Sequence, residues 1–214
     1  MDNFWENVSV YLPPYLSETS KNKLFEDLDK FNNRIDCGQE LYSKALKTAP
    51  FLMQGDGIDQ MYYVNLPSCD IKNVRAIICS NTCDISLDNL KTRKNPARIM
   101  YAPILSFAKY RNLLLTKFKE EQIHSHLVEI KKQHVTQILF LPMGDGLPED
   151  SIVFLDRMIS LPLKEDLVHH AIDHRIFTLS DTGFYLFLIK LSIHFTRVQE
   201  KIDRFAGIDV GAKK

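Results

Sequence analysis

A glycine-rich turn followed by a short apolar run constrains the fold more than any other stretch of this chain. Residues 144–156 read GDGLPEDSIVFLD. Gly144 and Gly146 permit positive φ angles, and Pro148 fixes the exit from the turn. The apolar run from Ile152 to Leu155 has the length of a strand. The stretch therefore predicts a tight turn that leads into a short buried strand.

Short β-type runs recur through the middle of the chain, from residue 52 to residue 163. We predict strands near 58–66, 75–80, 98–104, 137–141 and 151–160. A polar connection is expected from Asn81 to Pro96. Closure of such short strands into a small barrel removes their exposed edges. The middle of the chain is therefore expected to be a β core.

Helical periodicity marks the segments before, inside and after these strands. Apolar residues spaced three to four apart predict helices over 20–48, 107–132 and 182–205. The last of these is apolar on several sides, which places it either in the core or in a dimer seam. No apolar run reaches about 18 residues, so a membrane span is not expected.

Four short motifs follow one another along the middle of the chain: Gly55-Asp56, residues 75–80, residues 102–106 and residues 144–156. Their order resembles that of motifs in the MazF/PemK family, the toxin half of many bacterial toxin–antitoxin pairs. Gly55-Asp56 is similar to the turn that begins the barrel of that family, and residues 75–80 (RAIICS) resemble its next strand. Residues 102–106 (APILS) are similar to the following strand, and residues 144–156 resemble the end of the barrel.

The resemblance implies an α+β fold with a mainly β core, a small SH3-like or CcdB-type barrel. We expect an N-terminal helical extension over 1–50 and a MazF/PemK-like barrel over 51–165, with a helical insertion at 107–134. A C-terminal helical segment, 166–214, would pack on the barrel.

The resemblance also implies a catalytic pair for RNA cleavage. In the family an arginine of the second motif and a threonine of the third serve this reaction. Arg75 matches the arginine, and an arginine fork suits the charge of a scissile phosphate. Leu105 stands at the threonine position, so Ser106 is the candidate replacement. Leu105, and Ala76 in place of a proline, favour a protein that binds without cutting.

The net charge of zero conceals a basic segment. No acidic residue lies between Asp88 and Glu120, where eight of the 27 basic residues occur. The candidate nucleic-acid-binding residues in this segment are Lys91, Arg93, Lys94, Arg98, Lys109 and Arg111. Cations with interleaved aromatic residues suit single-stranded RNA, and the charges alone suit any polyanion or acidic protein.

Each of these features also has a plain structural interpretation. Arg75 could pair with a surface carboxylate at a strand end, residues 91–98 could be a solvated loop, and the aromatic residues could belong to the core. Cys83 is expected to be packed and unreactive, because nothing places a base beside it. His169, His170 and His174 lack the HExxH pattern, so surface or interface histidines are expected rather than a metal site.

Together these features favour an RNA-directed, MazF-like protein. It would be either a toxin-type endoribonuclease that needs no metal or organic cofactor, or a catalytically weakened descendant. The alternative is a non-catalytic barrel that binds nucleic acid or a protein, such as an acidic antitoxin. The sequence leaves a homodimer open. Four cysteines and the absence of a secretory signal predict a cytoplasmic protein with free thiols.

Overall fold

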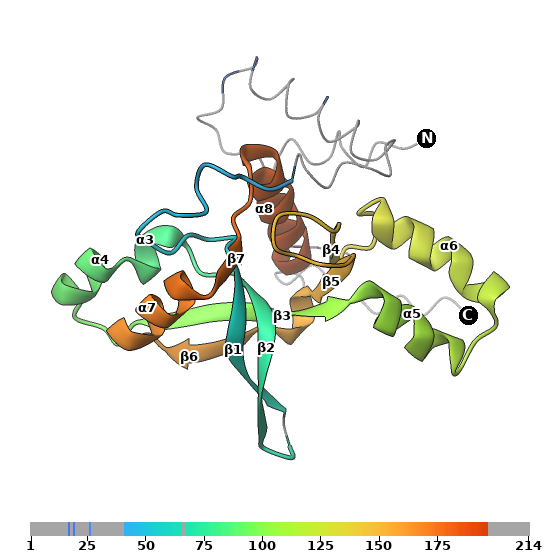
Figure 1. The fold of residues 1–214 in the computed structure, drawn as a ribbon, viewed down its shortest axis with the longest axis horizontal. Coiled ribbons are helices and arrows are strands. Elements are labelled where there is room, and N and C mark those ends of the chain that lie inside the picture. Colours follow the sequence, from blue (N-terminus) through green and yellow to red (C-terminus); the bar gives the residue numbers. More distant parts are fainter. Residues whose placement is uncertain (1–16, 18, 20–25, 27–40, 66, 197–214) are drawn as a thin grey trace, which may run out of the picture.

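The computed structural model describes residues 17, 19, 26, 41–65 and 67–196 of the chain (Figure 1). Within them the fold is α+β, with six helices and one antiparallel sheet of seven strands. The strands are β1 (Gly57–Asn65), β2 (Asp70–Ile78), β3 (Arg98–Ser106), β4 (Ile138–Leu141), β5 (Ser151–Phe154), β6 (Ile159–Pro162) and β7 (Arg175–Phe177). The helices are α3 (Thr82–Ile85), α4 (Leu87–Thr92), α5 (Phe107–Leu115), α6 (Glu120–Lys131), α7 (Glu165–Asp173) and α8 (Asp181–Thr196).

The sheet follows the order β4-β5-β3-β2-β1-β7, and β6 pairs with β3 as well. β5 and β6 thus lie along the same strand, β3, at its two ends. A 3₁₀ turn over Leu155–Arg157 separates β5 from β6. Its three residues match the shift of three in the pairing register between the two ladders. All five predicted strand regions therefore lie in one antiparallel sheet, as expected.

The predicted closure into a barrel is wrong for the described residues, because the sheet ends at β4 and β7. The side chain of Gln133 occupies the free edge of β4. Its Nε2 donates to the Phe140 carbonyl at 2.7 Å, and its Oε1 accepts from the Phe140 amide at 3.0 Å. A buried strand edge must satisfy its backbone groups. Here a side-chain amide does so where a closing strand would in a barrel.

Both faces of the sheet are buried, so neighbouring residues along one strand enter different cores. Ile77 packs in the cluster that contains Phe187 of α8, whereas Ala76 and Ile78 pack in the cluster beneath α7. A third cluster joins the α5–α6 hairpin to β4 and β5. This arrangement explains why residues 138–141 form a continuous apolar run without alternation.

The helices depart from the sequence prediction in three places. The segment 41–50, expected to be helical, forms turns and a single bridge from Tyr42 to Leu179. The polar connection 81–96 contains α3 and α4 rather than a loop. The single helix expected over 107–132 is a hairpin of two helices, α5 and α6. The last expected helix, 182–205, corresponds to α8, which is described as far as Thr196. The helices expected within 1–40 fall almost wholly outside the described residues, as do positions 197–205.

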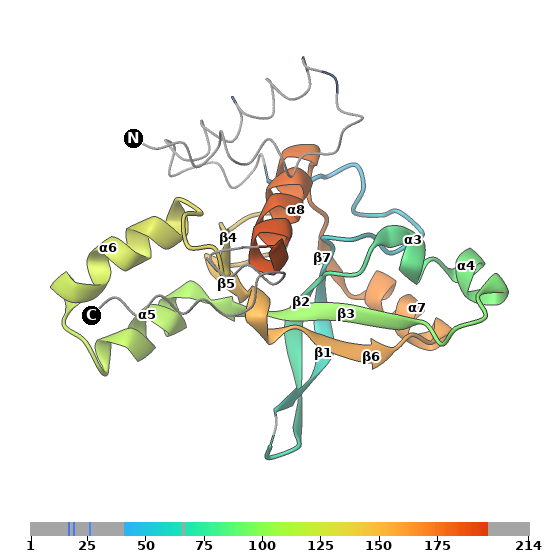
Figure 2. The same cartoon turned by 180° about the vertical axis from the view of Figure 1, so that it is seen from behind.

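α8 lies centrally over the sheet, with α3, α4 and α7 toward one end and α5 and α6 toward the other (Figures 1 and 2). Leu186, Phe187 and Ile189 of α8 are buried, so this helix is part of the core. No helix among the described residues has the length and apolar character needed to cross a bilayer.

Candidate functional site

Arg75, the arginine expected to meet phosphate, lies opposite a bulge in the neighbouring strand. The register of β1 and β2 shifts between Ile58 and Met61, so two β1 residues face Arg75 alone. Gln60, inside the bulge, has φ of +59°. Bulges re-aim side chains and are common beside active sites. The half-buried Arg75 side chain has no ion pair or hydrogen bond with any described residue, so the expected pairing with a carboxylate is not present.

Ser106, the other expected catalytic residue, ends β3 and caps α5. Its Oγ accepts from the Lys109 amide at 3.3 Å and donates to Oε2 of Glu149 at 2.7 Å. Capping is a common structural role for serine at a helix start. The hydroxyl is therefore already engaged in two hydrogen bonds within the fold.

The two candidate residues belong to different ladders. Pairing of β2 with β3 ends at Ala76 and Pro103, so both Arg75 and Ser106 lie beyond it. Ser106 pairs instead with Ser151 of β5. The structure links the Ser106 hydroxyl to Glu149, not to Arg75. A joint catalytic role for the two remains a prediction.

The glycine-rich motif forms a turn that docks on β7. Gly144 and Leu147 form an isolated bridge. Gly146 has φ of +132°, and a Cβ there would lie 2.2 Å from the carbonyl oxygen of Ile176. Only glycine fits such an approach without displacement. Of the two glycines expected to use positive φ, Gly146 does so, whereas in place of Gly144 it is Asp145 that has φ of +42°.

The carboxylates of this turn are held by partners. Asp145 pairs with Lys47 at 3.2 Å, and Asp150 pairs with Lys131 at 2.9 Å. Burial of Asp150 is partial, and its second oxygen accepts from the Met143 amide at 3.1 Å. The motif that carries the family resemblance is thus fixed in place by contacts to three parts of the chain. All the contacts described for this motif serve to hold the turn in place.

The basic segment, continuous in sequence, is divided between the two ends of the molecule. β3 runs between them, and its residues Arg98 and Ser106 are roughly 26 Å apart at about 3.3 Å per residue. Lys91, Arg93, Lys94 and Arg98 lie at the α4 end, whereas Lys109 and Arg111 lie on α5 (Figure 1). The six predicted residues therefore do not form one patch.

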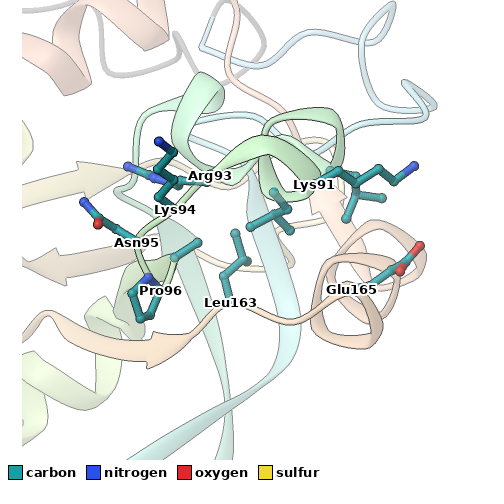
Figure 3. A pocket seen from close by; sticks show the side chains of 10 residues that line it. Lys91, Arg93, Lys94, Asn95, Pro96, Leu163 and Glu165 are labelled. Carbon is teal, nitrogen blue, oxygen red and sulfur yellow. The ribbon is translucent and has the colours of Figure 1, made fainter.

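At the α4 end, three of the four cations line a cavity of about 490 Å³, which is called the α4 cavity below. They are Lys91, Arg93 and Lys94. Figure 3 shows Lys91 and Glu165 toward one side and Arg93, Lys94 and Asn95 toward the other, with Leu163 between them. Lys91 and Lys94 are exposed and have no ion pair with a described residue. An exposed ammonium without a carboxylate partner is available to an anionic ligand.

A second hollow of about 860 Å³, the α8 cleft, shares Arg93 and Asn95 with the α4 cavity. It adds Arg98 and the apolar side chains of Met100, Leu191 and Phe195. Phe195 is 65% exposed. Cationic groups and an exposed aromatic ring therefore meet in one concave surface, as in proteins that bind single-stranded nucleic acids.

Both arginines of the α8 cleft are held in position by the fold. Arg98 donates from Nε to Ser160 Oγ at 2.8 Å and from Nη2 to the Ser160 carbonyl at 2.7 Å. Arg93 donates to the Asp84 carbonyl at 3.1 Å and to its carboxylate at 3.0 Å. Two bonds each leave further N–H groups of the planar guanidinium for a ligand.

The α5 end is built differently. Arg111 pairs with Glu120 of α6, and Tyr110 lies 3.0 Å from His126 Nε2. Tyr110 also packs edge-on against Phe154, and Phe107 is buried. The interpretation of these aromatic residues as core residues is thus confirmed for Phe107 and for Tyr101, which is wholly buried, whereas Tyr110 is half-buried at the edge of the third cluster.

A buried polar cluster was missed by the sequence prediction. Asp56 accepts hydrogen bonds from the Met53 amide and Thr178 Oγ1, both at 2.9 Å, and lies 3.1 Å from Arg175 Nε. Burial raises the pKa of Asp56 to about 6, against the lowering effect of Arg175. The Nη groups of Arg175 donate to backbone carbonyls of the 46–51 segment. Because Asp56 is wholly buried, we assign this cluster a structural role: it holds the 46–51 segment against β7. The Gly55-Asp56 motif was its only signal in the sequence.

The remaining candidate residues have simple environments. Cys83 is exposed, so the expectation of a packed thiol is wrong, whereas Cys79 is buried and its pKa is raised to about 12 by that burial. His169 approaches Glu165 at 3.7 Å on the surface of α7. Across the described part of the chain, no group of three or more His, Cys, Asp or Glu residues is placed to hold a metal ion.

Comparison with protein-family models and with curated proteins finds no match to this chain.

Proposed function

We propose that this chain binds single-stranded RNA through the α4 cavity and the α8 cleft. The observation that supports this most is the position of Arg93 and Arg98, fixed by Asp84 and Ser160 at the edge of a partly apolar cleft. Preorganised guanidinium groups bind phosphate at a low entropic cost. Exposed apolar and aromatic side chains beside them suit unstacked bases.

The geometry supports binding better than cleavage. The Ser106 hydroxyl is engaged by Glu149 and by the helix that it caps. Leu105, at the position of the family threonine, has no group that can transfer a proton. On this proposal the chain is a divergent MazF-type protein in which an open antiparallel sheet has replaced the closed barrel.

A toxin-type endoribonuclease is the second candidate function. It is favoured by Arg75, which stands at a strand bulge and has no carboxylate partner among the described residues. Family-type cleavage would rest on side chains alone, so it would survive chelation of metals. An acidic antitoxin-like protein is the partner that this candidate implies, because it would neutralise the same cations.

The test compares two charge reversals in a direct binding assay. Lys91→Glu with Lys94→Glu changes the α4 cavity, and Lys109→Glu with Lys117→Glu is the matched control on the far end. We expect the first pair to weaken binding of a fluorescent RNA 12-mer on the order of 10-fold or more, with a shallower dependence on salt. We expect the control pair to bind like wild type.

The same samples decide between the two functions. End-labelled RNA of mixed sequence is incubated with the protein in EDTA, and Arg75→Ala is run beside wild type. Intact RNA that nevertheless binds supports the binding module. Cleavage that falls about 100- to 1000-fold in Arg75→Ala supports the ribonuclease. Equal RNA affinity of both charge-reversed proteins would overturn the proposed interface.

A further inference from the structure

A third hollow lies on the opposite side of the connection between β6 and α7. This α7 cavity has a volume of about 480 Å³. Residues at the junction of β6 and α7 alternate between two hollows, since Leu163 and Glu165 line the α4 cavity and Lys164 and Asp166 line the α7 cavity. The two cavities are therefore separated by this short junction, which includes the first turn of α7. A ligand that occupies one of them is adjacent to the other.

The α7 cavity is bordered by a column of near-parallel rings. The ring of Tyr62 lies 6.3 Å from that of His170, at an interplanar angle of 13°. His170 in turn stacks on His174, with ring centroids 4.1 Å apart. Tyr62 is 47% exposed, so the outermost ring of the column presents surface to solvent. The flat face of this ring is therefore accessible for stacking against a ligand.

Hydrogen bonds fix the two histidine rings of this column and the backbone of Tyr62. His170 Nε2 lies 3.2 Å from the carbonyl of Gln60 in the β1 bulge, so this nitrogen carries the proton. His174 Nδ1 likewise donates to the His170 carbonyl at 2.8 Å. The carbonyl of Tyr62 accepts from the Tyr101 hydroxyl. The platform is thus held ready before any ligand arrives, and the bulge that faces Arg75 is one of its supports.

We propose that Tyr62 and His170 form a stacking subsite for a nucleobase, and that Lys164 and Asp166 make guanine the preferred base. This inference rests on the proposed function, because it adds a base-reading site beside the phosphate-binding cations. Guanine combines N–H donors on one edge, which suit a carboxylate, with the O6 and N7 acceptors, which suit an ammonium group. Uracil and cytosine offer a smaller surface for stacking on the rings.

Substitution of the outer ring tests the subsite. Tyr62→Leu removes the aromatic face, Tyr62→Phe keeps it, and Tyr63→Leu on the same strand is the control. RNA 8-mers of uridine with one central guanosine are compared with the same oligomer carrying an abasic nucleotide there. Wild type and Tyr62→Phe should prefer the guanosine oligomer about 5- to 100-fold, the range of base–aromatic stacking. Tyr62→Leu should show no preference, and Tyr63→Leu should retain that of wild type.

A second measurement separates this inference from the proposed function. Guanosine monophosphate and uridine monophosphate are titrated into the protein while the ring resonances of Tyr62 are followed by NMR. Shifts with guanosine monophosphate that exceed those with the uridine nucleotide support the subsite, even if long RNA does not bind. Salt-dependent RNA binding that is identical for wild type and Tyr62→Leu, with no ring shifts, overturns the subsite and leaves the proposed function standing.

Discussion

The α4 end and the α5 end of this molecule take their cations from the same acid-free stretch of sequence, yet the two ends differ in structure. At the α4 end Lys91 and Lys94 are exposed beside two hollows. At the α5 end the helical hairpin is closed by Arg111 and Glu120 and packed on β4 and β5. Unpaired charge alone does not distinguish the two ends, because Lys109 and Lys117 at the α5 end are also exposed with no ion pair to a described residue. The α4 end differs in that its cations line two hollows. The cations are divided between the two ends because β3 carries the chain from one end to the other.

The largest expected effect concerns the turn that anchors the packed end. Gly146→Ala should lower the free energy of unfolding by about 3 kcal/mol or more, because the new Cβ meets the Ile176 carbonyl at a strained φ. Gly144→Ala, at a position without positive φ, is the control and should cost far less. Urea denaturation followed by circular dichroism measures both. Equal stability of the two variants would mean that the turn does not anchor this end.

The next effect concerns the free edge of β4. Gln133→Ala should destabilise the protein by about 2–3 kcal/mol, because the amide and carbonyl of Phe140 lose their buried partners. Asn95→Ala at the α4 end should change stability by less than about 0.5 kcal/mol. The comparison of the two ends would be reversed if Asn95→Ala were the more harmful substitution in the same denaturation assay.

A pH dependence should also arise at the packed end. Lys190 donates to the carbonyls of Gln133 and Val135 at 2.8 Å and 2.6 Å, and burial lowers its pKa to about 7. The unfolded chain then binds more protons than the folded one above pH 7. Stability must therefore rise with pH, by at most about 1.4 kcal/mol per unit. The difference in unfolding free energy between wild type and Lys190→Met should shift in favour of wild type from pH 7 to pH 8.5. A constant difference would contradict the lowered pKa.

The sequence predicted the strands well because each carries a dense apolar run bounded by turn residues. Residues 138–141 are an example, since a strand was expected over 137–141. The strand expected over 151–160 is instead divided into β5 and β6 by a 3₁₀ turn. The open sheet could not be foreseen, because the edge of β4 is satisfied by one glutamine side chain. Nothing in the local sequence of Gln133 distinguishes it from a polar residue at a helix end.

The site was less predictable than the fold for a similar reason. Whether a cationic side chain is held by the fold or is open to a ligand depends on its partners. These partners are remote in the sequence or look like any other polar residue. Arg98 is held by Ser160, 62 residues later, and Ser106 by Glu149. The exposed ring of Tyr62 is supported by His170 across the β1 bulge. Only the capping role of Ser106 had a readable signal, a serine at the junction of a strand and a helix.

The smallest effect is the sharpest test of the comparison, because it uses two nearly identical substitutions. Arg93→Gln and Arg111→Gln each remove one exposed ion pair, with Asp84 and with Glu120 respectively. Exposed pairs of this kind contribute less than about 1 kcal/mol, so both variants should unfold within about 1 kcal/mol of wild type.

Their RNA affinities should nevertheless differ, since only Arg93 lines the α4 cavity and the α8 cleft. Loss of one phosphate contact reduces the slope of log affinity against log salt by about 0.7 for a single strand. Arg93→Gln should show that reduction and Arg111→Gln should not. If both slopes fall together, the two ends act as one surface and the division drawn along β3 is wrong.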